Sequence, residues 1–330
     1  MFPSSSQSKF WMFNSEEELT DLRKKANAKH IDKYGTDIPV TEKFNYFLNA
    51  EEEKVMVKKY EQHLRDFCKR FQPPMPRCVI GTSFHYFKRF YINNSVMNYH
   101  PKEIMVTCIY LACKVEEFNV SIMQFVSNIR GDREKASDII LNNELLLMEQ
   151  LNFHLSIHNP YRPIEGLLID IKTRCSLNDP ERLRPGTEHF VEKAFLTDAV
   201  LLYSPSQVAL AAILHAASKL HENLDAYVTD TLFGAQEAGR LVELIEAVRS
   251  IRSMVKLMDN GSDKATQQML EKKLDKCRNP ENNPDTEIYK KRLMAMLDEE
   301  DDLYHAISAR NESMDNSALN MALPDSPECP

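Results

Sequence analysis

Two charged residues lie within apolar stretches of helical periodicity, where a charge needs a partner. Lys114 lies in the stretch Met105–Val115, and Glu144 directly precedes Leu145–Met148. Glu144 also shares a helical face with apolar residues, namely Ile140, Leu147, Met148 and Leu151. Because burying an unpaired charge is costly, each side chain must pair with the other or with a group outside the domain. Residue spacing alone favours the first alternative, a structural Lys114–Glu144 ion pair.

The motifs that most often carry catalysis are absent from the chain. There is no G-x-x-x-x-G-K-[ST], G-x-G-x-x-G, H-E-x-x-H or G-x-S-x-G. None of the seven cysteines forms a Cys-x-x-Cys pair, and histidines such as His85 and His215 have no companions at metal-ligand spacing. We therefore expect no catalytic residues, no metal site and no cofactor.

Two further patterns have simple structural explanations. An aromatic series would suit base stacking, but its helical spacing favours the core; it comprises Phe84, Tyr86, Phe87, Phe90 and Tyr91. Ser204-Pro205 would suit phosphorylation, but a serine N-cap followed by proline at the first helical position explains the pair more simply.

Size and charge narrow the function classes. The 330 residues suffice for about two domains. The 41 Lys and Arg against 49 Asp and Glu give a net charge of −8, which disfavours a general nucleic-acid-binding surface because such surfaces are basic. No signal-peptide core is present, and no apolar run reaches the roughly 18 residues of a membrane span. We expect a soluble, intracellular protein.

Apolar residues three and four positions apart, with only eight glycines, predict an all-α fold. Ser15 is the expected N-cap of a first helix, with Glu18 completing a capping box. Five helices follow: from Asn49, through Val79–Phe90, from Pro101, after Ser121, and over about Glu134–Leu151.

An internal repeat indicates duplicated domains. Tyr99–Ala112 matches Tyr203–Ala216 at a constant offset of 104 residues, which is too long for a solenoid repeat. After the second copy, a charged helix through Leu270, Leu274 and Cys277 precedes a stretch with the composition of a disordered acidic tail. The predicted divisions are an N-terminal helix and loop (1–46), two domains (47–157 and 158–259), and the C-terminal helix and tail (260–330).

Three motifs together resemble the first box of the cyclin family: Phe87-Lys-Arg-Phe, Leu111-Ala-Cys-Lys-Val-Glu-Glu, and Glu144-Leu-Leu-Leu-Met-Glu-Gln-Leu-Asn-Phe. The resemblance implies two tandem five-helix cyclin boxes with extra N-terminal and C-terminal helices. In that family the Lys and the Glu reach backbone groups that flank the C-helix of a protein kinase, which overrides the ion-pair interpretation. The implied kinase-binding residues are Lys114, Val115, Glu117, Glu144, Met148, Phe153 and Leu155.

Within the family, three stretches are similar to the cyclin of the CDK-activating kinase: Phe10–Leu19, Phe87–Val96 and Ile157–Gly166. The similarity implies a nuclear, non-catalytic activator of that kinase, supporting phosphorylation of cell-cycle kinase activation loops and of the RNA polymerase II C-terminal repeats. Its implied partners are the cyclin-dependent catalytic subunit, a RING-finger assembly subunit and the core of transcription factor IIH, with no direct nucleic acid and no membrane. The alternatives are a transcriptional cyclin like cyclin C and, in another class, a nucleic-acid-binding adaptor resembling transcription factor IIB.

One feature of cell-cycle cyclins is missing. Their first box helix carries a Met-Arg-x-x-Leu-x-x-Trp docking patch, whereas here the segment Glu53–Leu64 lacks it and the only tryptophan is Trp11. The side chains expected on the exposed side of this helix are Lys58, Lys59, Glu61, Gln62 and Arg65. We therefore expect no substrate docking through it.

Overall fold

The computed structural model describes residues 2–36, 38–175, 177, 179–233, 238–258 and 263–295. The chain divides into two compact units, Met1–Arg278 and Asn279–Pro330. Every regular element in the described ranges is helical, which confirms the predicted all-α fold. The second unit includes a 3-10 turn, η4 (Pro280–Asn282). The acidic stretch Asp298–Asp302, which belongs to the predicted tail, lies outside the described residues.

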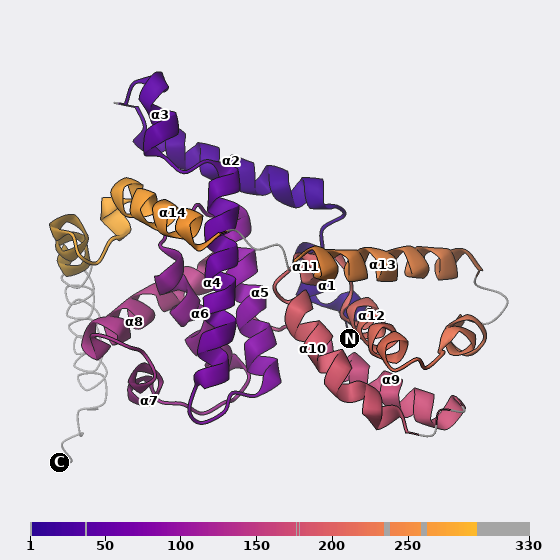
Figure 1. Cartoon of the computed structure of the whole chain (residues 1–330). Helices are drawn as coiled ribbons and strands as arrows, with labels where there is room; N and C mark the ends of the chain where they lie inside the picture. Colours follow the sequence, from indigo (N-terminus) through magenta and orange to yellow (C-terminus); the bar gives the residue numbers. More distant parts are fainter. Residues whose placement is uncertain are drawn as a thin grey trace, which may run out of the picture. The chain divides into compact units, whose positions relative to one another are not determined.

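Fourteen α-helices are described in the larger unit (Figure 1). The first eight are α1 (Ser6–Phe10), α2 (Glu16–Tyr34), α3 (Val40–Tyr46), α4 (Ala50–Arg70), α5 (Arg77–Asn93), α6 (Pro101–Val115), α7 (Ile122–Ser127) and α8 (Arg133–Gln150). The next six are α9 (Tyr161–Arg174), α10 (Arg184–Ala194), α11 (Ala199–Leu202), α12 (Pro205–Lys219), α13 (Ala238–Leu257) and α14 (Lys264–Cys277). Short turns η1 (Phe2–Ser4), η2 (Pro180–Leu183) and η3 (Tyr227–Phe233) complete the unit.

The helices begin at the predicted capping residues. Asn49 and Glu52 form a reciprocal capping box at the start of α4, with both hydrogen bonds 2.9 Å long. Ser204 caps α12 in the same way. At α2 the Ser15 hydroxyl accepts from the Glu18 N–H, but the Glu18 carboxylate accepts from the backbone of Asn14 instead of Ser15. Local side-chain chemistry therefore fixes where these elements start.

Helix α5 is the centre of the first repeat because α2, α4 and α6 all pack against it. Its aromatic residues are almost wholly buried, which confirms the core interpretation of Phe84, Tyr86, Phe87, Phe90 and Tyr91. Helix α6 lies between α4, α5 and α8. Helix α8 therefore has one face on the core and another left at the surface.

The predicted repeat is visible in the helix bounds. α6 and α12 each have 15 residues and start at Pro101 and Pro205, at the same offset as the sequence match. Both are followed by a left-handed residue at the equivalent position, Glu117 (φ 56°) and His221 (φ 57°). Helix α12 is the centre of the second repeat, in contact with α9, α10 and α13. The duplicated architecture is confirmed, while the domain boundaries at 47–157 and 158–259 stay a prediction.

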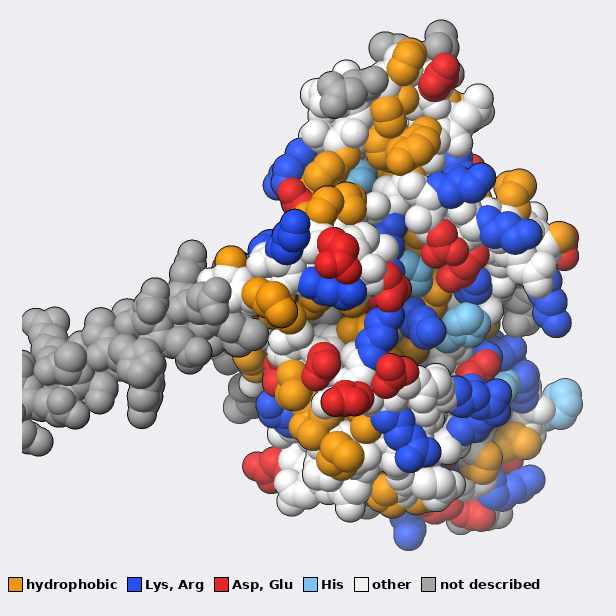
Figure 2. Space-filling view, turned by 90° about the vertical axis from the view of Figure 1, so that its left-hand side faces the viewer, with side chains coloured by type: hydrophobic (Ala, Val, Ile, Leu, Met, Phe, Trp, Pro, Cys, Tyr) orange, Lys and Arg blue, Asp and Glu red, His pale blue; other side chains and the backbone are white. Residues whose placement is uncertain are grey.

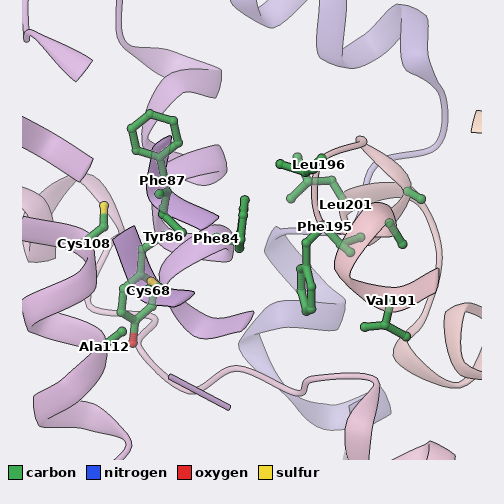
Figure 3. Packing of buried hydrophobic residues seen from close by; sticks show 14 of the residues in the cluster. Cys68, Phe84, Tyr86, Phe87, Cys108, Ala112, Val191, Phe195, Leu196 and Leu201 are labelled. Atoms are coloured by element: carbon green, nitrogen blue, oxygen red, sulfur yellow. The ribbon is translucent and has the colours of Figure 1, made fainter. Parts of the chain in front are cut away.

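The two repeats share one hydrophobic core. Phe84 of α5 stacks on Phe195, which follows α10, with ring centroids 5.6 Å apart (Figure 3). The carboxylates of α10 also turn toward the first repeat: Glu192 pairs with Lys69 at 2.7 Å, and Glu188 pairs with Arg77.

The prediction that Glu61 is exposed on α4 was wrong. Its side chain is buried and accepts a hydrogen bond from the Lys88 ammonium group at 2.7 Å. Lys88 also lies 3.7 Å from Asp198, which accepts two hydrogen bonds from Arg23. Burial would raise the pKa of Asp198, but the hydrogen bonds from Arg23 and the Lys88 charge hold it well below its usual range. Two anions and two cations thus neutralise one another inside the unit.

The rest of that side of α4 is also less open than predicted. Of the other residues predicted to be exposed there, Lys58 is exposed, whereas Lys59, Gln62 and Arg65 are partly covered. Helix α14 packs against α4, and Glu271 pairs with Lys59. Leu270, Leu274 and Cys277 form the buried face of α14, as their spacing predicted.

Candidate functional site

Lys114 and Glu144 meet at the surface, where the end of α6 lies beside α8. The Lys114 ammonium group lies 2.6 Å from a Glu144 carboxylate oxygen. The Lys114 side chain remains 50% exposed, whereas that of Glu144 is 12% exposed. The ion pair that spacing favoured is therefore present in the unbound chain. Because half of the lysine side chain still faces solvent, it remains accessible to a partner.

The ends of α6 and α8 beside this pair adopt the same backbone conformation. The N–H of Phe118 donates to the Cys113 carbonyl at 2.9 Å, and the N–H of Phe153 donates to the Met148 carbonyl at 2.9 Å. Both are Schellman motifs, in which the chain turns through a left-handed residue. At the end of α6 that residue is Glu117 (φ 56°), and at the end of α8 it is Asn152 (φ 51°), after which Phe153 (φ 55°) is left-handed as well. Glycine usually supplies this conformation. Two predicted site residues are thus placed by helix termination.

An apolar strip runs along α8 next to the ion pair. It consists of Leu141, Leu145, Met148 and Phe153, of which Leu145 and Phe153 are 57% and 59% exposed. Figure 2 views the side of the molecule that carries α8 and α14 in Figure 1, and it shows hydrophobic side chains exposed among charged ones. Of the other predicted residues, Val115 and Leu155 are half-buried at the ends of the same helices. Exposed apolar side chains gathered in this way are typical of a protein-binding surface.

Leu141 and Leu145 were absent from the predicted site. Their spacing with Met148 places all three on one helical face. That face lies beside the one formed by Ile140, Leu147 and Leu151, which are all fully buried. The sequence contains a signal for this surface. A helix that packs only against the core needs one apolar face, so a second apolar face beside it indicates another contact.

The N-terminal segment supports the residues that follow α8. The indole N–H of Trp11 donates to Nδ1 of His154 at 3.0 Å, and the Phe10 ring stacks on the same imidazole at 4.9 Å. Gln7 accepts from the N–H of His158 at 2.7 Å and donates to its carbonyl at 3.4 Å. Residues far apart in sequence therefore hold the segment that contains Phe153 and Leu155.

Helix α5 supports the same segment from the core side. The Tyr86 hydroxyl donates to the Leu155 carbonyl at 2.6 Å, and Arg89 donates to the His154 carbonyl at 3.2 Å. The Arg89 guanidinium also lies 4.9 Å from the Trp11 ring, and burial lowers its pKa to about 9. The arginine of the Phe87-Lys-Arg-Phe motif is thus a positioning residue within the core.

This arrangement offers binding chemistry. A cation and a carboxylate lie beside an exposed apolar strip on braced helix ends, so the site can hold another protein's backbone and side chains. Among the residues the structure covers, no three or more His, Cys, Asp or Glu are arranged to hold a metal ion. Within the same ranges, no helix is long and apolar enough to cross a membrane. The fold and the site together define a duplicated helical scaffold that exposes an apolar strip beside an ion pair.

Family models give this scaffold its class. The cyclin N-terminal domain matches residues 36–156, and the cyclin C-terminal domain matches residues 159–256. The chain belongs to the cyclin family.

Two relatives within the cyclin family differ in how similar they are to this chain. Cyclin-H of Xenopus laevis is 44% identical over 289 residues, covering 85% of this chain and 88% of that protein. Cyclin-C of Drosophila melanogaster is 32% identical over 215 residues, covering 61% and 76%. The greater identity and coverage favour the predicted similarity to cyclin H over the cyclin C alternative.

Solved structures agree with this family. A chain of the CAK complex from Chaetomium thermophilum, bound to ATP-gamma-S, has a TM-score of 0.74 and 25% identity, covering 89% of this chain and 93% of that one. A chain of the yeast TFIIK (Kin28/Ccl1/Tfb3) complex has a TM-score of 0.61 and 26% identity, covering 77% and 100%.

Proposed function

We propose that the chain is the regulatory cyclin subunit of a CDK-activating kinase. The observation that carries this proposal is the apolar strip of α8, which is exposed beside the Lys114–Glu144 pair. Similarity to Xenopus laevis cyclin-H and to a chain of a CAK complex supports the choice of kinase. In this role the chain itself catalyses nothing and acts by binding.

Activation follows from the shape of the binding surface. A protein kinase needs the ion pair between its β3 lysine and its C-helix glutamate in place before phosphoryl transfer. Lys114 and Glu144 act as polar anchors on backbone groups at the ends of that helix. Val115, Met148, Phe153 and Leu155 form the apolar bed, to which Leu141 and Leu145 add area, and Glu117 lies at its rim. Because the bed is braced by Trp11 and Arg89, it can fix the C-helix in one position.

The wider assembly follows from the same similarity. We propose a RING-finger assembly subunit and the transcription factor IIH core as further partners, and the nucleus as the location. The yeast TFIIK structure, a complex of three named proteins, supports a three-subunit kinase module. The substrates would be the activation loops of cell-cycle kinases and the C-terminal repeats of RNA polymerase II.

Affinity purification tests the proposal most directly. The tagged full-length chain, expressed in its own cells, should recover a cyclin-dependent kinase that phosphorylates both substrate classes in vitro. A Leu145→Glu, Phe153→Glu double variant should lose the kinase, whereas Met269→Glu, at an exposed position of α14, should retain it. Recovery of promoter DNA without a kinase would instead support the adaptor alternative, which the net charge of −8 disfavours.

A further inference from the structure

A hollow of about 320 Å³ lies between α10, α12 and α13 in the second repeat. Figure 1 shows these three helices together, away from α6 and α8. Among the described residues, every ionisable side chain that lines the hollow is basic: His189, Lys193, His215, Lys219, Arg252 and Lys256. Phe190 and Val255 form its apolar floor and are buried. Cations from three separate helices therefore converge on one small volume.

Three of the cations that line this basic hollow lack neutralising partners among the described residues. Within the described ranges, Lys219, Arg252 and Lys256 make no hydrogen bond or ion pair. The carboxylates of α10 do not compensate them, because Glu188 and Glu192 pair with Arg77 and Lys69 of the first repeat.

The pKa of His215, one of the two histidines that line the hollow, responds to the same positive charges. Burial, followed by the charges of Lys219, Arg252, Lys193 and His189, lowers the pKa of His215. Like charges held this close repel one another, and a bound anion would relieve that repulsion.

We propose that the basic hollow binds a phosphorylated serine or threonine side chain of a partner protein. A phosphate group carries nearly two negative charges and three acceptor oxygens, which suits several converging lysine and arginine donors. The volume is at the small end of ligand pockets, which matches one phosphorylated side chain. The hollow shares no helix with the apolar strip, so a partner docked here leaves the kinase-binding surface free. This inference does not depend on the proposed function.

A phosphopeptide fits the observations better than a nucleic acid. Nucleic-acid backbones follow grooves or stripes of positive charge over several phosphates, whereas this charge is confined to one hollow. The floor residue Phe190 is buried against His215, with ring centroids 4.9 Å apart, so it offers no face for base stacking.

Fluorescence anisotropy with the full-length chain tests the proposal. The probe is a short fluorescent Gly/Ser peptide with one central phosphothreonine, compared with its unphosphorylated form. Arg252→Gln and Lys219→Gln should each weaken phosphopeptide binding at least about tenfold, because each removes charge-assisted hydrogen bonds. Arg162→Gln and Lys172→Gln are the matched controls, since both residues are exposed on α9 of the same repeat and outside the hollow, and both should bind normally.

An NMR titration locates the ligand independently. Phosphopeptide binding should raise the pKa of His215 because it adds negative charge among the surrounding cations. Equal affinity for the two peptides, equal losses in the control variants, or binding that leaves His215 unchanged would each overturn the proposal. Single-stranded RNA that binds more tightly than the phosphopeptide, and is lost in the same variants, would replace it with a nucleic-acid site.

Discussion

Replacing Lys114 with alanine should separate kinase binding from stability. In the isolated chain, Lys114 pairs with Glu144 at 2.6 Å, but half of the lysine side chain is in solvent. An ion pair exposed to this degree contributes at most about 1 kcal/mol, so the free energy of unfolding should change by no more than that. Lys114→Ala should therefore fold and melt almost as the parent does.

Kinase affinity should respond far more strongly. In the complex, the lysine would donate charge-assisted hydrogen bonds to backbone carbonyls, which contribute roughly 1.5–3 kcal/mol each. Losing one such bond weakens binding about 10-fold to 150-fold. Glu144→Ala should have a comparable effect, since its carboxylate is proposed to bind backbone N–H groups.

Two measurements on each variant decide the matter: calorimetric unfolding of the free chain and surface-immobilised titration with the purified kinase. Lys102→Ala is the matched control, because Lys102 is an exposed lysine on the same helix α6, outside the candidate surface. A loss of about 3–5 kcal/mol in stability with unchanged kinase affinity is the signature of a structural ion pair. That result would refute our assignment of the two charges to the kinase.

Three other outcomes follow from the structure. Trp11→Phe removes the hydrogen bond to His154, so it should cost about 1–3 kcal/mol in thermal unfolding and also weaken kinase binding. Burial raises the pKa of Glu53 to about 7 from 4.5, so its contribution to stability is complete below pH 4.5 and is lost as pH rises through 7. Glu53→Gln should therefore be more stable than the parent above pH 7, by roughly 3 kcal/mol, and similar to it near pH 4.5 in pH-dependent denaturant unfolding. Arg-x-Leu peptides should not bind in titrations that include a cell-cycle cyclin as positive control, because α4 buries Tyr60 and Leu64 and is covered by α14.

A specific outcome would contradict each of these three predictions. Unchanged kinase affinity in Trp11→Phe would mean that the segment after α8 positions itself. A constant stability difference between Glu53→Gln and the parent across the pH range would show that Glu53 titrates normally in the folded chain. Micromolar Arg-x-Leu binding that is lost on mutating α4 would mean that α14 leaves a docking face open.

The sequence predicted most of what depends on neighbouring residues. The caps at Asn49 and Ser204, the long helices and the 104-residue repeat all depend on local chemistry or on direct comparison within the chain. The short helices α1 and α3 were not predicted, since a helix of five or seven residues is stable only through tertiary contacts. Glu61 was misplaced for a similar reason: the groups that neutralise its surroundings are remote in sequence.

Single residues of the candidate site also have conformations that depend on contacts remote in sequence. Glu117 and Phe153 have left-handed backbones, which glycine would adopt without strain. For other residues this conformation costs roughly 1–2 kcal/mol each. Asn152, just before Phe153, is of a type that favours this conformation, but no local pattern marks Glu117 or Phe153 themselves, because the surrounding fold imposes their left-handed backbone. At Phe153 the two residues that follow are held in place: Trp11 and Arg89 donate hydrogen bonds to His154, and Tyr86 donates one to Leu155. A strained, exposed phenylalanine at the end of the apolar strip gives the isolated chain little stability. Its position is best explained by a partner that covers it, and this supports a binding role for the residues that the cyclin resemblance first indicated.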